Sequence, residues 1–141
     1  MNATDRIDYT RPFAENVQGT LYARFRLDAD GDPIYETVDE GTRSYTIDIY
    51  LHSTQSNEIS TVIYFLDGSE AGQSLGRSVD QNNDFPATIE SAGDALLLVK
   101  VWMGLLRKYE QRAWLSQMLE NGYGKDPPAE VKSAILRIKV N

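Results

Sequence analysis

Three aspartates alternate with other residues at Asp28, Asp30 and Asp32, a spacing that can bring carboxylates around one hard cation such as calcium. An EF-hand loop that begins at Asp28 would need glycine at its sixth position and glutamate at its twelfth. Those positions hold Pro33 and Asp39. We therefore expect a hairpin turn and no metal site, because tight turns favour aspartate and glycine.

His52 is the only histidine of the chain, and it lies at the end of a predicted strand beside Ser53 and Thr54. A Ser-His-Asp triad can be assembled from distant segments. However, the sequence has no nucleophile-elbow glycine pattern and no second histidine for a metal. It also has no cysteine, which excludes thiol nucleophiles, thiolate metal ligands and disulfides. The sequence predicts a surface histidine, no cofactor and no enzymatic activity.

A group of cations is the main candidate for binding a charged partner. Arg107, Lys108 and Arg112 lie at helical spacing in a segment that we expect to be a helix. Their stripe could hold an acidic partner or the phosphate of a nucleotide-type anion, with Arg77 as a further cation. The alternative is an exposed helix face whose cations offset nearby acidic side chains.

Trp114 is the candidate apolar contact, because it follows closely after Arg112 and the two residue types are enriched at interface hot spots. The alternative is that Trp102 and Trp114 both belong to the core, where the predicted helix meets the strands. The sequence leaves both interpretations open.

The net charge of −7 is unevenly distributed. Residues 1–94 carry 17 acidic and 6 basic side chains, whereas residues 95–141 carry 4 acidic and 8 basic ones. An acidic body disfavours binding to nucleic acid or to an anionic membrane. No run is apolar enough to span a membrane, and the polar N-terminal residues do not resemble a secretion signal. We expect a cytoplasmic protein.

The spacing of apolar residues predicts a fold made mainly of strands. Tyr45, Ile47, Ile49 and Leu51 alternate with polar residues, so one face of this segment should be buried and the other solvated. Such alternation recurs along the chain, and we expect an all-β sandwich with one added helix. The predicted strands cover 17–27, 34–38, 44–51, 59–66, 85–89, 95–103 and 132–140.

The remaining segments should connect and decorate this sandwich. Residues 28–33 would turn the first strand into a hairpin with 34–38, and residues 67–84 would form a long surface loop. A helix is expected near residues 104–121, with Asn121-Gly122 as its C-terminal cap. Residues 1–16 read as an N-terminal arm and residues 17–141 as a single domain.

Two segments carry a resemblance to a known family. They read Arg43-Ser-Tyr-Thr-Ile-Asp-Ile-Tyr-Leu51 and Ile59-Ser-Thr-Val-Ile-Tyr-Phe-Leu66, and they are followed by the apolar strand that ends in Trp102. This pattern resembles the YEATS family, and above all its prokaryotic branch. The resemblance covers about 60 of the 141 residues, and it implies an immunoglobulin-like β-sandwich.

The eukaryotic members of that family hold an acylated lysine between aromatic side chains of two loops. At the positions of those aromatic residues this chain has Glu70 and Ala92, while Ser69 and Gly93 match their neighbours. A flat acyl-amide needs aromatic faces on both sides, so reading of acyl-lysine by this cage is not expected.

Together these observations predict a non-catalytic recognition module that binds a protein partner or a second copy of itself. The resemblance implies a place in bacterial or phage signalling or defence. The alternative function is a sensor for a nucleotide-type anion.

Overall fold

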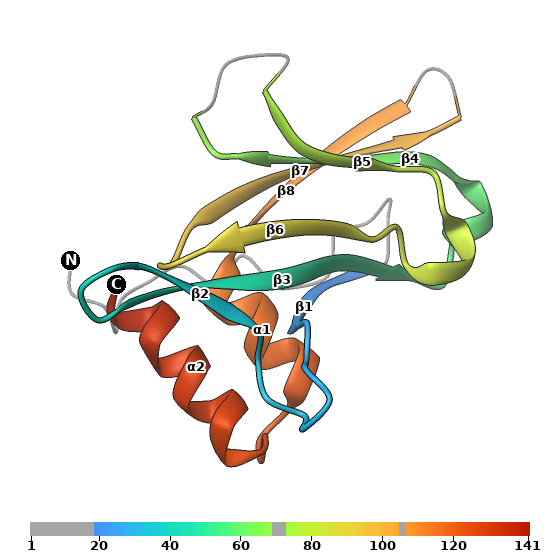
Figure 1. Cartoon of the computed structure of the whole chain (residues 1–141). Helices are drawn as coiled ribbons and strands as arrows, with labels where there is room; N and C mark the ends of the chain where they lie inside the picture. Colours follow the sequence, from blue (N-terminus) through green and yellow to red (C-terminus); the bar gives the residue numbers. More distant parts are fainter. Residues whose placement is uncertain (1–18, 69–72, 105–106) are drawn as a thin grey trace.

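The computed structural model describes residues 19–68, 73–104 and 107–141. These residues form two antiparallel sheets of four strands each and two helices, an arrangement that is mostly β and consistent with a β-sandwich (Figure 1). The strands are β1 (Gly19–Phe25), β2 (Tyr35–Asp39), β3 (Thr42–Ser53), β4 (Ile59–Leu66), β5 (Ser74–Ser78), β6 (Ala87–Ser91), β7 (Leu96–Met103) and β8 (Arg107–Trp114). The helices are α1 (Leu115–Tyr123) and α2 (Ala129–Val140).

Strand β3 is the centre of the first sheet, which we call sheet I. Strands β1 and β2 pair end to end with one edge of β3, and β6 pairs with the other edge. Ile47 lies opposite both Phe25 and Ile89, so its row crosses three strands. The predicted alternation is confirmed, because Tyr45, Ile47 and the apolar residues that follow at every second position are buried.

The second sheet, sheet II, has the strand order β5-β4-β7-β8. One face of this sheet is buried in the core. Its buried residues pair across neighbouring strands, for example Tyr64 with Val99 and Leu97 with Ala113. Gly76 of β5 meets β6 of sheet I, since a Cβ atom added there would lie 2.7 Å from Cβ of Ala87. Only glycine lets the two sheets approach so closely at this edge.

Helix α1 covers the edge of β1 that does not pair with β3. The side chain of Asn121 donates a hydrogen bond to the backbone oxygen of Leu21 (2.9 Å), and the backbone N–H of Phe25 donates one to the hydroxyl of Tyr123 (3.0 Å). Gly122 lies between these two bonds, and a Cβ atom there would lie only 2.0 Å from the carbonyl oxygen of Ala23. The helix therefore satisfies backbone groups that an exposed edge strand would offer to other chains.

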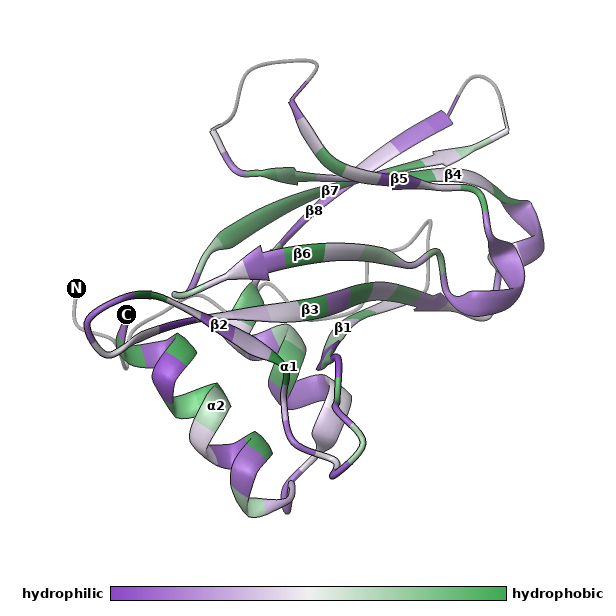
Figure 2. Ribbon diagram, in the orientation of Figure 1, coloured by the Kyte–Doolittle hydropathy of each residue, from purple (hydrophilic) through white to green (hydrophobic). Residues whose placement is uncertain are grey.

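Helix α2 packs its apolar side against the core. Val131, Ala134, Ile135 and Ile138 are buried, and Figure 2 shows hydrophobic segments recurring along the helix between hydrophilic ones. None of the helices in the described ranges is long and apolar enough to cross a membrane.

Residues 132–140 were expected to form a strand, and this prediction is wrong, because they belong to α2. Ala134 and Ile138 fit both patterns, since their spacing of four residues is even and also matches one helical turn. Leu136 and Val140, which the strand pattern placed inside, are exposed. Pro128 precedes the helix as its N-cap residue, a place where the missing N–H of proline costs nothing.

The expected helix near residues 104–121 is also corrected. Strand β8 occupies residues 107–114, and helix α1 begins only at Leu115. The C-terminal cap is Gly124, whose N–H donates to the carbonyl oxygen of Glu120, and not the predicted Asn121-Gly122. Strand β8 has few apolar residues because it is the last strand of sheet II, and this weakened its signal in the sequence.

Two further expectations are corrected in part. Strand β2 exists but pairs with β3, so the predicted hairpin with β1 is reduced to one bridge between Leu27 and Pro33. The predicted loop 67–84 contains β5 and a short 3-10 helix at Gln81–Asn83. The N-terminal arm lies outside the described residues.

Candidate functional site

The outer face of sheet II carries an unusual mixture of aromatic, apolar and basic side chains. Because successive residues of a strand point to opposite faces, this face is formed by the residues that alternate with the buried ones. We define the outer face by Ile63, Phe65, Arg77, Leu98, Lys100, Trp102, Lys108, Glu110, Arg112 and Trp114. Its apolar members are only half-buried, whereas the solvated face of an antiparallel sheet is normally polar.

Cross-strand rows bring basic and aromatic side chains together on this face. Trp102 pairs with Lys108, whose ammonium lies 6.0 Å from the centre of the indole ring. The ammonium of Lys100 lies 5.0 Å from the centre of the Phe65 ring. Both distances are within the range at which a cation is attracted to a ring.

Among the described residues, the carboxylates near this face are fewer than its cations. Glu110 lies 3.9 Å from Lys100 and 3.6 Å from Lys108, so one carboxylate serves two ammonium groups. Arg112 donates a hydrogen bond to Asp67 at 3.1 Å. Arg77 makes no ion pair with any of the described residues. The described part of the outer face thus carries more cations than carboxylates, on a chain whose net charge is −7.

The structure gathers most of the predicted binding residues here, but by strand geometry and not by helical spacing. Arg77, Lys108, Arg112 and Trp114 all lie on the outer face. Arg107 does not, because it is an odd-numbered residue of β8, and its guanidinium donates to the hydroxyl of Tyr109 instead. The predicted helical stripe is therefore wrong in its geometry, although two of its three cations, Lys108 and Arg112, lie on one face together with Arg77.

A second polar cluster lies on the solvated face of sheet I. Asp84 accepts a hydrogen bond from the hydroxyl of Tyr22 (2.6 Å), and its other oxygen lies 3.2 Å from Nδ1 of His52. The ring of Tyr22 stacks on that of Tyr50 at 4.7 Å. The exposed imidazole of His52 therefore has the Asp84 carboxylate as its neighbour.

Burial and the neighbouring Asp84 carboxylate raise the pKa of Tyr22. In the unfolded chain a tyrosine titrates near pH 10. Above that pH the unfolded chain loses this proton while the folded protein keeps it, so the stabilising contribution of Tyr22 is present below about pH 10 and is lost at higher pH. Tyr22→Phe should cost about 1 kcal/mol at pH 7. This difference from the unmodified protein should shrink between pH 10 and 11 in urea unfolding; a constant difference would contradict the assignment.

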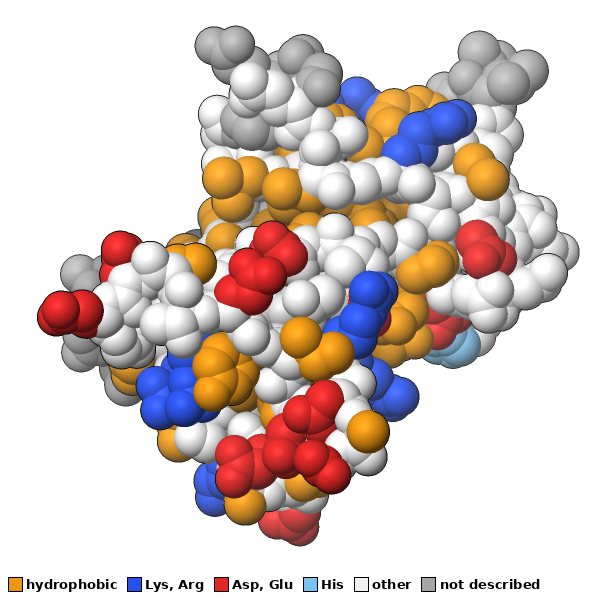
Figure 3. Space-filling view, in the orientation of Figure 1, with side chains coloured by type: hydrophobic (Ala, Val, Ile, Leu, Met, Phe, Trp, Pro, Cys, Tyr) orange, Lys and Arg blue, Asp and Glu red, His pale blue; other side chains and the backbone are white. Residues whose placement is uncertain are grey.

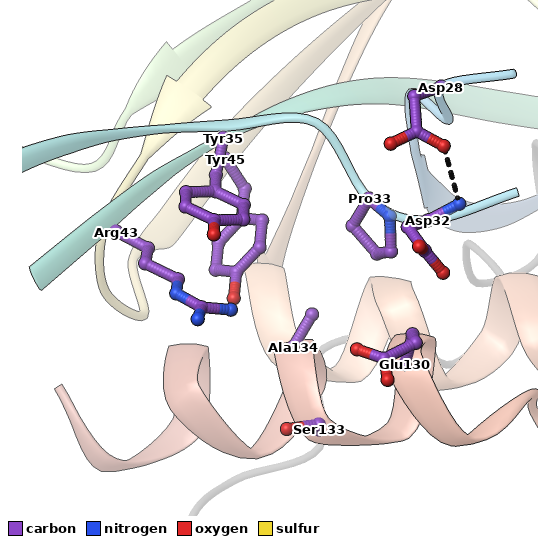
Figure 4. A pocket seen from close by; sticks show the side chains of 9 residues that line it. All are labelled: Asp28, Asp32, Pro33, Tyr35, Arg43, Tyr45, Glu130, Ser133 and Ala134. Carbon is purple, nitrogen blue, oxygen red and sulfur yellow. Dashed lines mark hydrogen bonds between the residues drawn. The ribbon is translucent and has the colours of Figure 1, made fainter. Parts of the chain in front are cut away.

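The third candidate is a cavity of about 270 Å³ between the β2–β3 hairpin and α2, which we call the hairpin pocket (Figure 4). It is lined by Asp28, Asp32, Pro33, Tyr35, Arg43, Tyr45, Glu130, Ser133 and Ala134. Figure 4 shows Arg43 with the two tyrosines at one end and the carboxylates at the other. None of these residues was singled out as a pocket residue from the sequence, since Glu130 joins Asp32 only through the packing of α2.

No family model matches this chain, and no curated protein matches it. The resemblance to the YEATS family accordingly remains a prediction from the sequence.

The positions of the YEATS aromatic cage are only partly described. Ser69 and Glu70 lie outside the described residues. Ala92 and Gly93 lie in the turn between β6 and β7, where the Asn141 side chain donates a hydrogen bond to the carbonyl oxygen of Ala92 (3.2 Å). A Cβ atom on Gly93 would lie 2.9 Å from the backbone oxygen of Asn141. This turn therefore contacts the end of α2 in the same chain.

The aspartate-rich segment forms the expected turn. Asp28 Oδ1 accepts hydrogen bonds from the backbone N–H groups of Asp30 (2.9 Å) and Asp32 (3.0 Å), and Gly31 has a φ of +85°. Within the described ranges no group of three or more acidic or histidine side chains is placed to hold a metal ion.

Proposed function

We propose that this protein is a recognition module whose outer face of sheet II binds a partner segment in which acidic side chains stand next to apolar ones. The observation that carries this proposal is the convergence of half-buried Trp102, Trp114 and Phe65 with an excess of cations on one face. Aromatic residues and arginine supply most of the energy of protein interfaces.

Charge complementarity favours an acidic occupant. A carboxylate of the partner would contact Arg77, Lys108 or Arg112. The apolar side chains of the partner would cover the aromatic rings of the outer face. Opposite charge also speeds association with the correct partner and repels basic ones. The acidic remainder of the chain disfavours binding of nucleic acid to the same molecule.

The finer fold assignment is part of this proposal. An immunoglobulin-like sandwich of the YEATS type is supported by the two four-stranded antiparallel sheets and by the strand patterns at 43–51 and 59–66. A cytoplasmic location is supported by the absence of cysteine. A role in bacterial or phage signalling or defence rests on the sequence resemblance alone.

The test is selection of peptides from a random display library on the immobilised full chain, followed by fluorescence anisotropy with the selected peptides. We expect them to be rich in Asp or Glu beside Leu, Phe or Trp. The double variant Lys108→Glu/Arg112→Glu should raise their Kd by about tenfold or more, because it reverses two contacting charges. Trp102→Ala should weaken binding to a similar degree.

The matched control is Lys125→Glu/Lys132→Glu, which makes the same change in net charge at exposed positions near the helices. Circular dichroism should show that all variants are folded. The proposal fails if the selected peptides are not acidic, or if both double variants weaken binding equally. It also fails if the chain associates with itself and the first double variant abolishes that association, because the occupant is then a second copy.

A further inference from the structure

The hairpin pocket lies away from the outer face of sheet II and has charged groups of opposite sign at its two ends. At one end the guanidinium carbon of Arg43 lies 4.2 Å from the centre of the Tyr35 ring, and Figure 4 shows Arg43 beside both tyrosines. This cation–π contact positions the guanidinium, and no carboxylate among the described residues lies within ion-pair distance of it. A guanidinium held against an aromatic ring in this way is suited to bind a carboxylate in bidentate geometry.

The other end of the pocket carries carboxylates and, among the described lining residues, no cation. Asp32 comes from the β1–β2 turn and Glu130 from the first turn of α2, and neither forms an ion pair with the described residues. Desolvation and the neighbouring carboxylates Asp28 and Glu130 raise the pKa of Asp32. Figure 3 shows acidic side chains gathered over this part of the molecule. A bound cation would relieve this repulsion.

The walls between the two ends include apolar side chains. Pro33 and the Tyr35 ring lie on one side and Ala134 on the other, so an alkyl chain could lie between the charged ends (Figure 4). The volume of about 270 Å³ is just below the range of roughly 300–1,000 Å³ that drug-sized ligands occupy. The pocket is therefore of a size for a metabolite as small as an amino acid.

We propose that the hairpin pocket binds a basic amino acid. The carboxylate of the ligand would contact Arg43, and the guanidinium or ammonium group of the ligand side chain would lie between Asp32 and Glu130. A free amino acid and the C-terminal residue of a peptide present the same two charged ends. This activity would make the protein a sensor of a zwitterion and not of a nucleotide-type anion. The residues that the sequence suggested for an anion, Arg77, Arg107, Lys108 and Arg112, do not line this pocket.

The test is isothermal titration calorimetry of the full chain with L-arginine, L-lysine, agmatine and L-citrulline. Agmatine lacks the carboxylate, and citrulline lacks the charge at the far end of the side chain. We expect arginine or lysine to bind, and both agmatine and citrulline to bind at least about tenfold more weakly than arginine. A short peptide that ends in arginine, titrated in parallel with its C-terminal amide, separates a free amino acid from a chain end.

Variants then locate the binding site. Arg43→Gln and Asp32→Asn should each weaken arginine binding by about tenfold. Arg107→Gln removes an exposed arginine on the other sheet and should leave the Kd unchanged. Circular dichroism checks folding, and Asp32→Asn, in an exposed turn, remains informative if Arg43→Gln does not fold. The proposal is overturned if neither basic amino acid binds at millimolar concentration, if agmatine binds as well as arginine, or if Arg107→Gln weakens binding as much as the pocket variants.

Discussion

Replacing Gly122 by alanine is expected to destabilise the protein by about 3 kcal/mol, because the new methyl group would meet the backbone of β1. The added Cβ atom would lie 2.0 Å from the carbonyl oxygen of Ala23 and 3.2 Å from Cγ of Arg24. Helix α1 would have to move away from β1 and lengthen the hydrogen bonds that Asn121 and Tyr123 make with that strand. Urea unfolding followed by circular dichroism measures the change.

The sign of this effect separates two physical explanations. Alanine forms helices better than glycine by about 1 kcal/mol, so helix propensity alone predicts that Gly122→Ala stabilises the protein. Glu120→Ala is the control in the same helix, since Glu120 is exposed and loses only a surface ion pair with Lys139. Its effect should stay within about 1 kcal/mol. An equal or higher stability of Gly122→Ala would show that α1 does not lie against β1 as described.

Phe85→Ala should cost about 3–5 kcal/mol, which is typical of removing a fully buried aromatic ring. Phe85 is completely buried although its φ is +51°, a region that bulky residues rarely adopt. Its backbone is held from both sheets: the Tyr64 hydroxyl donates to its carbonyl oxygen (2.8 Å), and Leu51 N–H donates to the carbonyl oxygen of Asp84 (2.9 Å). Burial of the ring outweighs the strain of about 1–3 kcal/mol in this backbone.

The neighbouring residue provides the control for Phe85→Ala. Asp84 also has a positive φ of 59°, and asparagine tolerates this conformation and still accepts a hydrogen bond from Tyr22. Asp84→Asn should therefore change the free energy of unfolding by less than about 1 kcal/mol. Thermal unfolding of both variants beside the unmodified protein gives the comparison. A loss of less than about 1 kcal/mol in Phe85→Ala would mean that the ring does not close this end of the core.

Strands whose two faces differ were predicted well from local pattern. β3 and β4 have buried and solvated faces with a period of two, and that period is visible in any window of the sequence. β8 and α2 were misassigned for related reasons. β8 is an edge strand with few apolar residues, so its alternation of apolar and polar residues is weak. In α2 the apolar residues recur every two residues, as in a strand, and also every four, as in a helix. In both elements tertiary neighbours decided the conformation.

The residue types of the candidate sites were visible in the sequence, but their grouping was not. Lys108 and Arg112 were chosen for a helix face and Trp114 as an interface anchor, yet the three share a face because every second residue of a strand does. Arg77 joins them through the pairing of β5 with β4, some thirty residues earlier in the chain than Lys108. Arg43 and Glu130 could not be recognised as pocket residues from the sequence, because no periodic residue pattern marks a pocket between a hairpin and a distant helix.

By itself the amino-acid sequence determined the strand-rich character of the chain, the turn at Asp28–Asp32 and the exclusion of thiol chemistry, because these follow from residue type and short-range spacing. Only the tertiary structure decided that β2 pairs with β3, that α1 covers β1 through Gly122, and which charged side chains meet. The reason is that contacts between distant segments depend on packing and hydrogen-bond completion in the whole fold, whereas local periodicity reports only which side of a segment is buried.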